Sequence, residues 1–311
     1  MMGSLSILVS LSLSIVVIFS VQKYFLSNNL IDKVNSRSSH ISTATRSGGV
    51  SIFLTIFFIS VYFYLIGYEI FNFSLLIPLA LLVLVGLYDD INNIDFKLKF
   101  VFQIIAAKII IDNGLIIENL HGFLGIFELN RVLAQTLTIF IIVAIINSIN
   151  FIDGIDGLAI SITLLFIVSF EFFALATTPY LNLSKILAPS LVPLYYFNFR
   201  NNNKVFLGDS GSLFLGGLIS IYVIQILTNN YIIKEEFDLH KIIFIISILF
   251  YPIMDLIRIF FLRIMKGNSP FKPDKNHIHH IINNKIKSHY KSVSLIITLS
   301  IFVLIFIQVI F

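Results

Sequence analysis

Four short polar stretches interrupt a chain that is otherwise strongly apolar. They are Y-D-D-I-N-N-I-D (88–95), N-S-I-N-F-I-D-G-I-D-G-L (147–158), V-F-L-G-D-S-G-S-L (205–213) and P-D-K-N-H-I-H-H (273–280). Proteins hold Mg²⁺ with one or two carboxylates together with substrate phosphates, and histidine exchanges protons or binds metals near neutral pH. These stretches are therefore the candidates for a functional site.

The first and third stretches carry carboxylates where an apolar run ends or begins. Asp89 and Asp90 are adjacent, so they repel each other unless a cation or a proton lies between them. Asp209 stands in G-D-S-G-S, and a glycine-rich helix N-terminus attracts anions such as phosphate. Both stretches fit Mg²⁺ or proton chemistry. A solvated helix end at Asp89 and Asp90, and helix capping by Asp209 or Ser210, are equally good explanations.

The second stretch places polar residues at every third position, namely Asn147, Asn150, Asp153 and Asp156. At this spacing they share one face of a helix or of a 3₁₀ turn. Gly154 and Gly157 follow the two aspartates and permit the close approach of a ligand or a backbone. An Asx-turn that caps the next helix would explain Asp156 alone. The regular spacing of all four polar residues therefore favours a binding site.

The fourth stretch contains three histidines, His277, His279 and His280. A zinc site is the first interpretation, but the chain has no cysteine and no H-E-x-x-H motif, which disfavours zinc. Histidines beside Lys272 and Lys275 suit phosphate equally well. A basic loop that contacts anionic lipid headgroups is the simpler alternative.

The elements that must position these residues are membrane spans. Of the 311 residues, 57% are hydrophobic and 12% are charged, about half the charged fraction of a soluble domain, and the mean hydropathy is +0.95. This composition predicts an all-α polytopic membrane protein. The sequence pI of about 9.1 would suit a nucleic-acid partner, but excess Lys and Arg in a membrane chain more often set topology, so no nucleic acid is expected.

A membrane-spanning helix needs about 20 apolar residues. Ten segments qualify: 5–25, 50–67, 73–88, 98–113, 132–149, 157–177, 184–198, 213–228, 241–262 and 293–311. Several are short and one contains Lys108, so eleven spans is the alternative count. The N-terminal run lacks a basic region and a cleavage site, so we interpret it as the first span. Residues 1–311 are predicted to form a single integral-membrane domain.

The distribution of Lys and Arg orients these spans. One set of alternate connections holds 14 of these residues and the opposite set holds 4. By the positive-inside rule the first set is cytoplasmic, which puts both termini on the outer side. All four polar stretches then fall on the cytoplasmic face, although only Lys and Arg were used to assign it. We therefore predict one cytoplasmic pocket with 147–158 as one of its walls.

Six motifs follow one another along residues 31–280: I-D-K-V-N-S-R-S-S-H…R-S-G-G (31–49), G-L-Y-D-D (86–90), K-L-K-F-V-F-Q (97–103), N-F-I-D-G-I-D-G-L-A (150–159), V-F-L-G-D-S-G-S-L-F-L-G (205–216) and S-P-F-K-P-D-K-N-H-I-H-H (269–280). In this combination and order, the chain resembles the polyprenyl-phosphate N-acetylhexosamine-1-phosphate transferase superfamily, glycosyltransferase family 4. It looks like the initiating UDP-GlcNAc:undecaprenyl-phosphate GlcNAc-1-phosphate transferases, and the muramoyl-pentapeptide translocase is a more distant relative.

The resemblance implies a Mg²⁺-dependent enzyme of the bacterial cytoplasmic (inner) membrane, with Mn²⁺ as the alternative cofactor. In the implied reaction an oxygen of undecaprenyl phosphate attacks the β-phosphate of a UDP-N-acetylaminosugar and releases UMP. The product would initiate a cell-surface glycan, such as a cell-wall polymer, lipopolysaccharide or O-antigen. GlcNAc is the expected sugar because H-x-H-H is present, another UDP-aminosugar is the alternative, and a homodimer is compatible with the resemblance.

The resemblance also assigns roles by position. Asp209 matches the metal-binding aspartate. The implied catalytic residues are Asp89, Asp90, Asp153, Asp156 and His277. The implied substrate-binding residues are Lys33, Lys99, Asn150, Asn198, Phe206, Arg263, His279 and His280. Val34 and Ala44 stand where family members often have proline, a difference that concerns loop rigidity more than chemistry.

A membrane transporter is the alternative from another class. Charged residues inside membrane segments often mark an ion path, and this chain has Lys108, Glu171, Asp255 and Arg258 in its apolar runs. Asp255 and Arg258 are three residues apart, so they are expected to pair on one helix. Because the polar stretches stand at the ends of spans and not at their centres, the enzyme is favoured.

Overall fold

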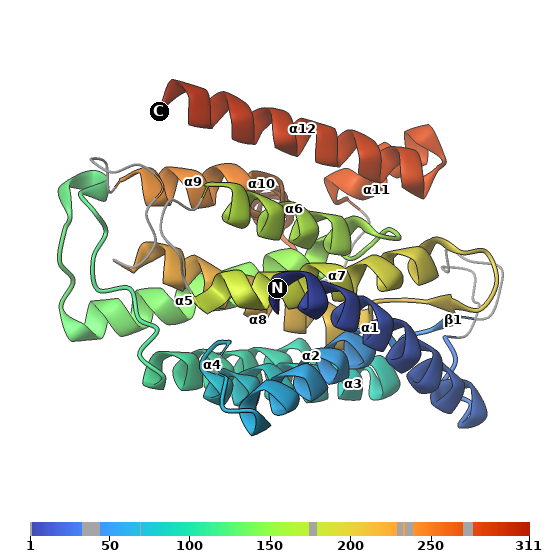
Figure 1. Cartoon of the computed structure of the whole chain (residues 1–311). Helices are drawn as coiled ribbons and strands as arrows, with labels where there is room; N and C mark the ends of the chain where they lie inside the picture. The colour runs from blue at the N-terminus through green and yellow to red at the C-terminus, as the bar shows by residue number, and fades with distance from the viewer. Residues whose placement is uncertain are drawn as a thin grey trace. The chain divides into compact units, whose positions relative to one another are not determined.

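The computed structural model describes residues 2–32, 44–68, 70–173, 179–228, 233, 239–269 and 276–311 (Figure 1). Regular structure in these residues is helical apart from two short strands, which confirms the predicted all-α class. The α-helices are α1 (Met2–Ser27), α2 (Gly48–Leu65), α3 (Leu76–Asn92), α4 (Phe96–Asp112), α5 (Arg131–Ile152), α6 (Leu158–Phe173), α7 (Pro179–Phe199), α8 (Gly208–Leu227), α9 (His240–Ile248), α10 (Phe250–Met265), α11 (Ile278–Ile286) and α12 (His289–Ile310). Single 3₁₀ turns are η1 (Phe73–Leu75) and η2 (Phe123–Gly125).

Each of the ten predicted apolar segments is occupied by helix in the part of the chain that the structure describes. Six helices there are long and apolar enough to cross a membrane, or seven if the bent pair α9 and α10 counts as one span. The α6 helix is apolar but shorter. The chain is therefore a polytopic membrane protein, and ten spans remain a prediction.

The segment predicted as one span, 241–262, is not one continuous helix. The chain bends by 72° between α9 and α10, at Leu249. Pro252 explains the break, because proline has no N–H to donate and its ring clashes with the preceding turn of a continuous helix. Within the first turn of a new helix proline is tolerated, and Pro252 has that place in α10.

The chain divides into two compact units, which we describe separately. Unit 1 comprises residues 1–109 and 178–215, and unit 2 comprises 110–177 and 216–311. In unit 1, α1 packs against α7 and α2, and Ser14 Oγ donates a 2.7 Å hydrogen bond to the Ser190 carbonyl. In unit 2, α12 packs against α9, α6 and α11, and α10 packs against α5.

A two-stranded parallel sheet in unit 1 brings distant motifs together. Strand β1 (Ala44–Thr45) pairs with β2 (Lys204–Val205), with Ala44 opposite Lys204. Just beyond the strands, the N–H of Gly48 donates to the Phe206 carbonyl at 3.0 Å. The starts of α2 and α8 are thus tied to each other through backbone hydrogen bonds.

Candidate functional site

Three helix ends of unit 1 meet in what we call the acidic cluster, formed by Asp89, Asp90, Lys99 and Asp209. Asp89 stands at the end of α3, Lys99 in the first turn of α4 and Asp209 in the first turn of α8. The Lys99 ammonium lies 2.8 Å from Asp89 Oδ2 and 3.0 Å from Asp209 Oδ2. Two carboxylates from separate helices therefore converge on one cation.

The two adjacent aspartates have different surroundings. Asp90 Oδ1 accepts a hydrogen bond from the N–H of Asp209 and Oδ2 accepts one from the N–H of Ser210, both at 3.0 Å. Its side chain is 2% exposed and lies 3.6 Å from Arg46 Nη1. A carboxylate in this position satisfies the free N–H groups of the helix start and is stabilised by the helix dipole. Asp90 therefore caps α8, while Asp89 turns toward Lys99.

Close packing of α3 on α8 permits this arrangement. A Cβ at Gly86 would lie 2.5 Å from the backbone of Asp209 and from that of Ser210. Only a glycine therefore lets the two helices approach this closely near their polar ends.

Arg46 supplies a second cation to the acidic cluster. Its guanidinium contacts Asp32 Oδ1 at 2.9 Å in addition to Asp90. Burial lowers the pKa of Arg46, but the neighbouring carboxylates of Asp32, Asp90 and Asp209 outweigh burial and raise that pKa above its ordinary value. Arg46 was not among the predicted site residues, although it stands in the motif R-S-G-G.

The acidic cluster offers the ligand type that Mg²⁺ prefers. Asp89 and Asp209 each present a carboxylate oxygen to the position that Lys99 Nζ occupies, at 2.8 and 3.0 Å from that nitrogen. Hard oxygen ligands of this kind, completed by water and substrate phosphate, fit Mg²⁺ if the lysine side chain moves aside. The residues present therefore fit a divalent cation.

Other predicted substrate residues of unit 1 lie near the β1–β2 sheet. Asn198 is buried and its side chain donates a 2.9 Å hydrogen bond to the Val205 carbonyl. Phe206 follows β2, with Lys204 Nζ 5.8 Å from the centre of its ring. Lys33 lies outside the described residues. The proposed contacts of these residues with a nucleotide remain predictions.

Unit 2 holds what we call the histidine cluster, formed by Asp255, His277, His279 and His280. His277 precedes α11 and the other two histidines lie in its first turn, with ring centres 5.4 Å apart for His277 and His279 and 4.2 Å for His279 and His280. Asp255 comes from α10 and is fully buried. The rings of His277 and His279 are stacked, the His280 ring is tilted by 53° against that of His279, and all three lie near a buried carboxylate.

Every oxygen of Asp255 accepts a hydrogen bond. Oδ2 lies 2.6 Å from His277 Nδ1, and Oδ1 lies 3.0 Å from Arg258 Nη2 and 2.9 Å from the N–H of Ile278. The predicted pairing of Asp255 with Arg258 is thus confirmed. Their link to the histidines was missed, because a separation of 22 residues carries no periodic signal.

A metal ion is disfavoured at this cluster. Asp255, His277 and His279 each offer a ligand atom, all within 4.8 Å of one another. However, Asp255 Oδ2 and His277 Nδ1 are 2.6 Å apart, whereas two ligands on one tetrahedral zinc lie about 3.3 Å apart. The short distance is that of a hydrogen bond, which occupies both groups.

His279 is fully buried, and its Nε2 has no hydrogen-bond partner among the residues that the structure describes. Burial lowers the pKa of His279 to about 3, and the neighbouring His280 and His277 act in the same direction. His279 is therefore neutral at pH 7. Its predicted role as a direct substrate contact remains untested.

The polar stretch 147–158 adjoins the histidine cluster. A Cβ at Gly154 would lie 2.3 Å from His279 Nε2 and 3.0 Å from His280 Nε2. Phe151 meets the His277 ring edge to face at 5.6 Å, and the guanidinium of Arg263 lies 5.6 Å from the Phe151 ring centre. The absence of a side chain at Gly154 is therefore what admits the histidines.

The predicted single helical face of Asn147, Asn150, Asp153 and Asp156 is wrong. Helix α5 ends at Ile152, Asp153 is its C-terminal cap, and Gly157 has a φ of +78° that stops the helix from continuing. Asn147 donates to the Val143 carbonyl of its own helix. Asp156 Oδ2 pairs instead with His289 Nδ1 at 2.8 Å, at the start of α12. His289 was not among the predicted site residues.

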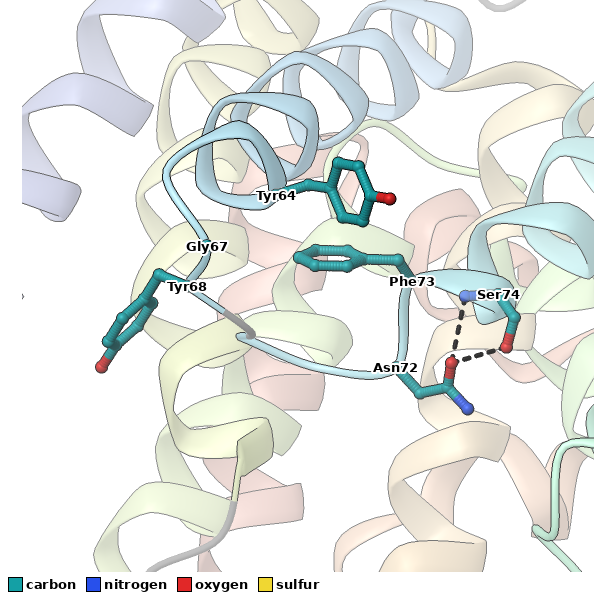
Figure 2. A pocket seen from close by; sticks show the side chains of 6 residues that line it. All are labelled: Tyr64, Gly67, Tyr68, Asn72, Phe73 and Ser74. Atoms are coloured by element: carbon teal, nitrogen blue, oxygen red, sulfur yellow. Dashed lines mark hydrogen bonds between the residues drawn. The ribbon is translucent and has the colours of Figure 1, made fainter.

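A hollow of about 380 Å³ lies elsewhere, at the connection between α2 and α3. Figure 2 shows its lining residues, Tyr64, Gly67, Tyr68, Asn72, Phe73 and Ser74. Asn72 Oδ1 accepts hydrogen bonds from the N–H of Ser74 at 3.1 Å and from its hydroxyl at 2.6 Å. None of these six described residues carries a charge.

Comparison with known proteins gives one consistent family. Residues 72–227 match the family model described as glycosyl transferase family 4. This segment contains the acidic pair, the stretch 147–158 and the G-D-S-G motif, and it ends before the histidines.

Relatives extend the similarity over most of the chain. An undecaprenyl-phosphate alpha-N-acetylglucosaminyl 1-phosphate transferase of Salmonella typhi is 31% identical over 300 residues, which cover 91% of this chain and 77% of the relative. A probable undecaprenyl-phosphate N-acetylglucosaminyl 1-phosphate transferase of Bacillus subtilis is 30% identical, with 93% and 79% covered. A decaprenyl-phosphate N-acetylglucosaminephosphotransferase of Mycobacterium leprae is 28% identical, with 93% and 79% covered.

Proposed function

Because this chain belongs to glycosyl transferase family 4 and is a sugar-1-phosphate transferase of that family, we propose that it transfers N-acetylglucosamine 1-phosphate from UDP-GlcNAc to undecaprenyl phosphate and releases UMP. The observation that carries the proposal is the convergence of Asp89 and Asp209 on one cation position at the ends of apolar helices. Two anionic substrates can react only where positive charge offsets their repulsion.

In this proposal Asp209 would hold Mg²⁺, and Asp89 lies beside the same cation position. When bound, Mg²⁺ neutralises the diphosphate and stabilises the charge that develops on the departing UMP. Lys99 and Arg46 remain charged beside the carboxylates and attract the substrate phosphates. Asp89, the more exposed aspartate of the pair, orients the lipid phosphate or accepts its proton. Asp90 keeps α8 in place and does not touch substrate.

The roles proposed for unit 2 concern the UDP-sugar. Asn150, Asp153 and Asp156 hold its polar groups, since amides and carboxylates accept and donate the hydrogen bonds that a sugar requires. His277 and His280 act at the diphosphate, with Arg263 beside them. Asn198 and Phe206 of unit 1 are the proposed uridine contacts, with the Phe206 ring stacking on the base.

The membrane arrangement is also a proposal. Ten spans with both termini outside would put the polar stretches on the cytoplasmic face, where UDP-sugars are found. The asymmetry of 14 against 4 basic residues supports that orientation. Helix-end carboxylates would then lie at the headgroup level, where the phosphate of the lipid substrate resides. We propose the bacterial cytoplasmic membrane as the location and a surface glycan as the destination.

The test is a transfer assay with purified protein, Mg²⁺, undecaprenyl phosphate and a panel of UDP-sugars. UDP-GlcNAc should release UMP and give a lipid of the mass of a GlcNAc diphosphate product. Asp209→Asn should abolish release, whereas Glu128→Gln, at an exposed carboxylate outside both clusters, should leave it intact. UMP release from a different UDP-aminosugar, and not from UDP-GlcNAc, would show that this other sugar is the substrate. If folded protein releases UMP from no UDP-aminosugar, the enzyme proposal is wrong.

A further inference from the structure

We propose that Asp255 is a positioning residue for the transfer reaction. It holds the His277 ring with the proton on Nδ1, so that any exchange of protons or hydrogen bonds with substrate takes place at Nε2. The proposal rests on the proposed function, because it assigns His277 to the substrate diphosphate.

The first step is the hydrogen-bond balance at the carboxylate. All three partners of Asp255 are positioned as donors: Arg258 Nη2, the N–H of Ile278 and His277 Nδ1. An ionised carboxylate only accepts hydrogen bonds. Because His277 Nδ1 lies 2.6 Å from Asp255 Oδ2, Nδ1 must carry a proton, both when the His277 ring is neutral and when it is charged.

The second step is the orientation of the ring. His277 is buried between Phe151, at 5.6 Å edge to face, and the His279 ring, at 5.4 Å and inclined by 20°. With Nδ1 held by Asp255, the opposite edge of the ring presents Nε2, which lies 3.5 Å from Arg263 Nη2. Because a guanidinium only donates, this contact also requires a neutral His277 ring to carry its proton on Nδ1. Nε2 is then the ring nitrogen that a substrate group would engage in place of Arg263.

The third step is the role of the helix bend. The break at Leu249 starts α10 in a new direction six residues before Asp255, and this carboxylate reaches the first N–H of α11, that of Ile278. One side chain thus fixes both the start of α11 and the ring that precedes it. Removing the charge should disturb the ring first, because α11 retains its other contacts with α12.

The closing experiment combines a mutant cycle with histidine spectroscopy. Asp255→Asn keeps the size of the side chain but can present an N–H₂ to Nδ1, which favours a proton on Nε2 instead. We expect turnover to fall about 10- to 100-fold, the usual effect of losing an orienting carboxylate, with little change in KM. His277→Gln should lower turnover at least as much, and the double variant should be no worse than His277→Gln alone. Asp112→Asn, at an exposed aspartate, is the matched control.

Nitrogen-15 spectra of histidine-labelled wild-type protein test the tautomer of His277 independently of enzyme activity. The His277 signal, identified by its loss in His277→Gln, should show a neutral ring protonated at Nδ1 at high pH. A neutral ring protonated at Nε2, full turnover in Asp255→Asn, or additive losses in the double variant would each overturn the proposal. If wild-type protein has no transfer activity, the proposed function fails, and the spectra still decide the tautomer. They do so even if Asp255→Asn does not fold.

Discussion

The N–H of Asp209 donates a 3.0 Å hydrogen bond to Asp90 Oδ1. The Asp90 carboxylate at the end of α3 therefore holds the backbone of Asp209 at the start of α8. Asp90 is 2% exposed, and its second oxygen accepts from the N–H of Ser210. This geometry makes Asp90 the cap of α8, and it positions the Asp209 side chain beside Asp89. The same device recurs in unit 2, where buried Asp255 accepts from the first N–H of α11.

Asparagine substitutions should separate the tasks of Asp89 and Asp90. Asp90→Asn loses a charge and replaces one acceptor by a donor, so we expect a loss of about 1–2 kcal/mol in stability, as for a lost helix cap, and lower turnover. Asp89→Asn keeps an acceptor for the Ile94 N–H and should abolish turnover while the melting temperature stays close to that of wild type. Thermal unfolding in detergent and UMP release measure the two effects. Equal melting temperatures for the two variants would contradict the capping role.

Much of this arrangement was predictable from sequence. Long apolar runs predicted the helices, since burial in lipid requires every backbone group to be bonded within its own segment. The polar stretches at their ends, including Asp89, Asp209 and His277, were found because charged residues are rare in such a chain. The stretches do converge within units: 88–95 with 205–213, and 147–158 with the histidines at 279 and 280.

The remaining features depend on contacts that no local pattern encodes. Asp90 and Asp209 are 119 residues apart, and Asp156 and His289 are 133 apart. Whether an aspartate binds substrate or caps a helix is decided by which helix start arrives beside it. Periodicity also failed at 153–156, because the left-handed Gly157 ends the regular backbone on which the spacing rule depends.

Lys99 should act as the internal counterion of the acidic cluster. In Lys99→Gln the carboxylates of Asp89 and Asp209 lose their shared cation, so the protein should unfold at a lower temperature without Mg²⁺. Added Mg²⁺ should raise the melting temperature more in this variant than in wild type, because binding to the native state alone is stabilising and no lysine competes.

Two comparisons control this experiment. Lys97→Gln, at an exposed lysine two residues away, should respond to Mg²⁺ as wild type does. A Lys99→Gln/Asp209→Asn double variant should lose the additional Mg²⁺ response. An identical response in Lys99→Gln and wild type would exclude Lys99 from the cation position.

His279 should make the protein sensitive to acid. Its pKa is about 3 in the native protein, below the ordinary value of 6.5, so between these values the unfolded chain binds a proton that the native protein does not. Stability contributed by neutral His279 is therefore complete above pH 6.5 and decreases as the pH falls toward 3, by up to about 1.4 kcal/mol per pH unit. His279→Gln should flatten the dependence of the melting temperature on pH between 6.5 and 4. A slope as steep as that of wild type would disprove this origin.

Gly154 should be indispensable for the histidine cluster. Its backbone does not have a positive φ, so alanine is acceptable to the local conformation, but the added Cβ would lie 2.3 Å from His279 Nε2. The histidine rings must then move, and we expect Gly154→Ala to cost about 1–3 kcal/mol, as overpacking does, and to reduce turnover.

Gly67→Ala is the informative control. There a φ of +72° makes alanine strained, yet no atom of the described residues lies within 4 Å of the added Cβ. Gly67→Ala should therefore lower the melting temperature without a loss of turnover. Normal turnover in Gly154→Ala would show that the close approach of this loop to the histidines is not required for the reaction.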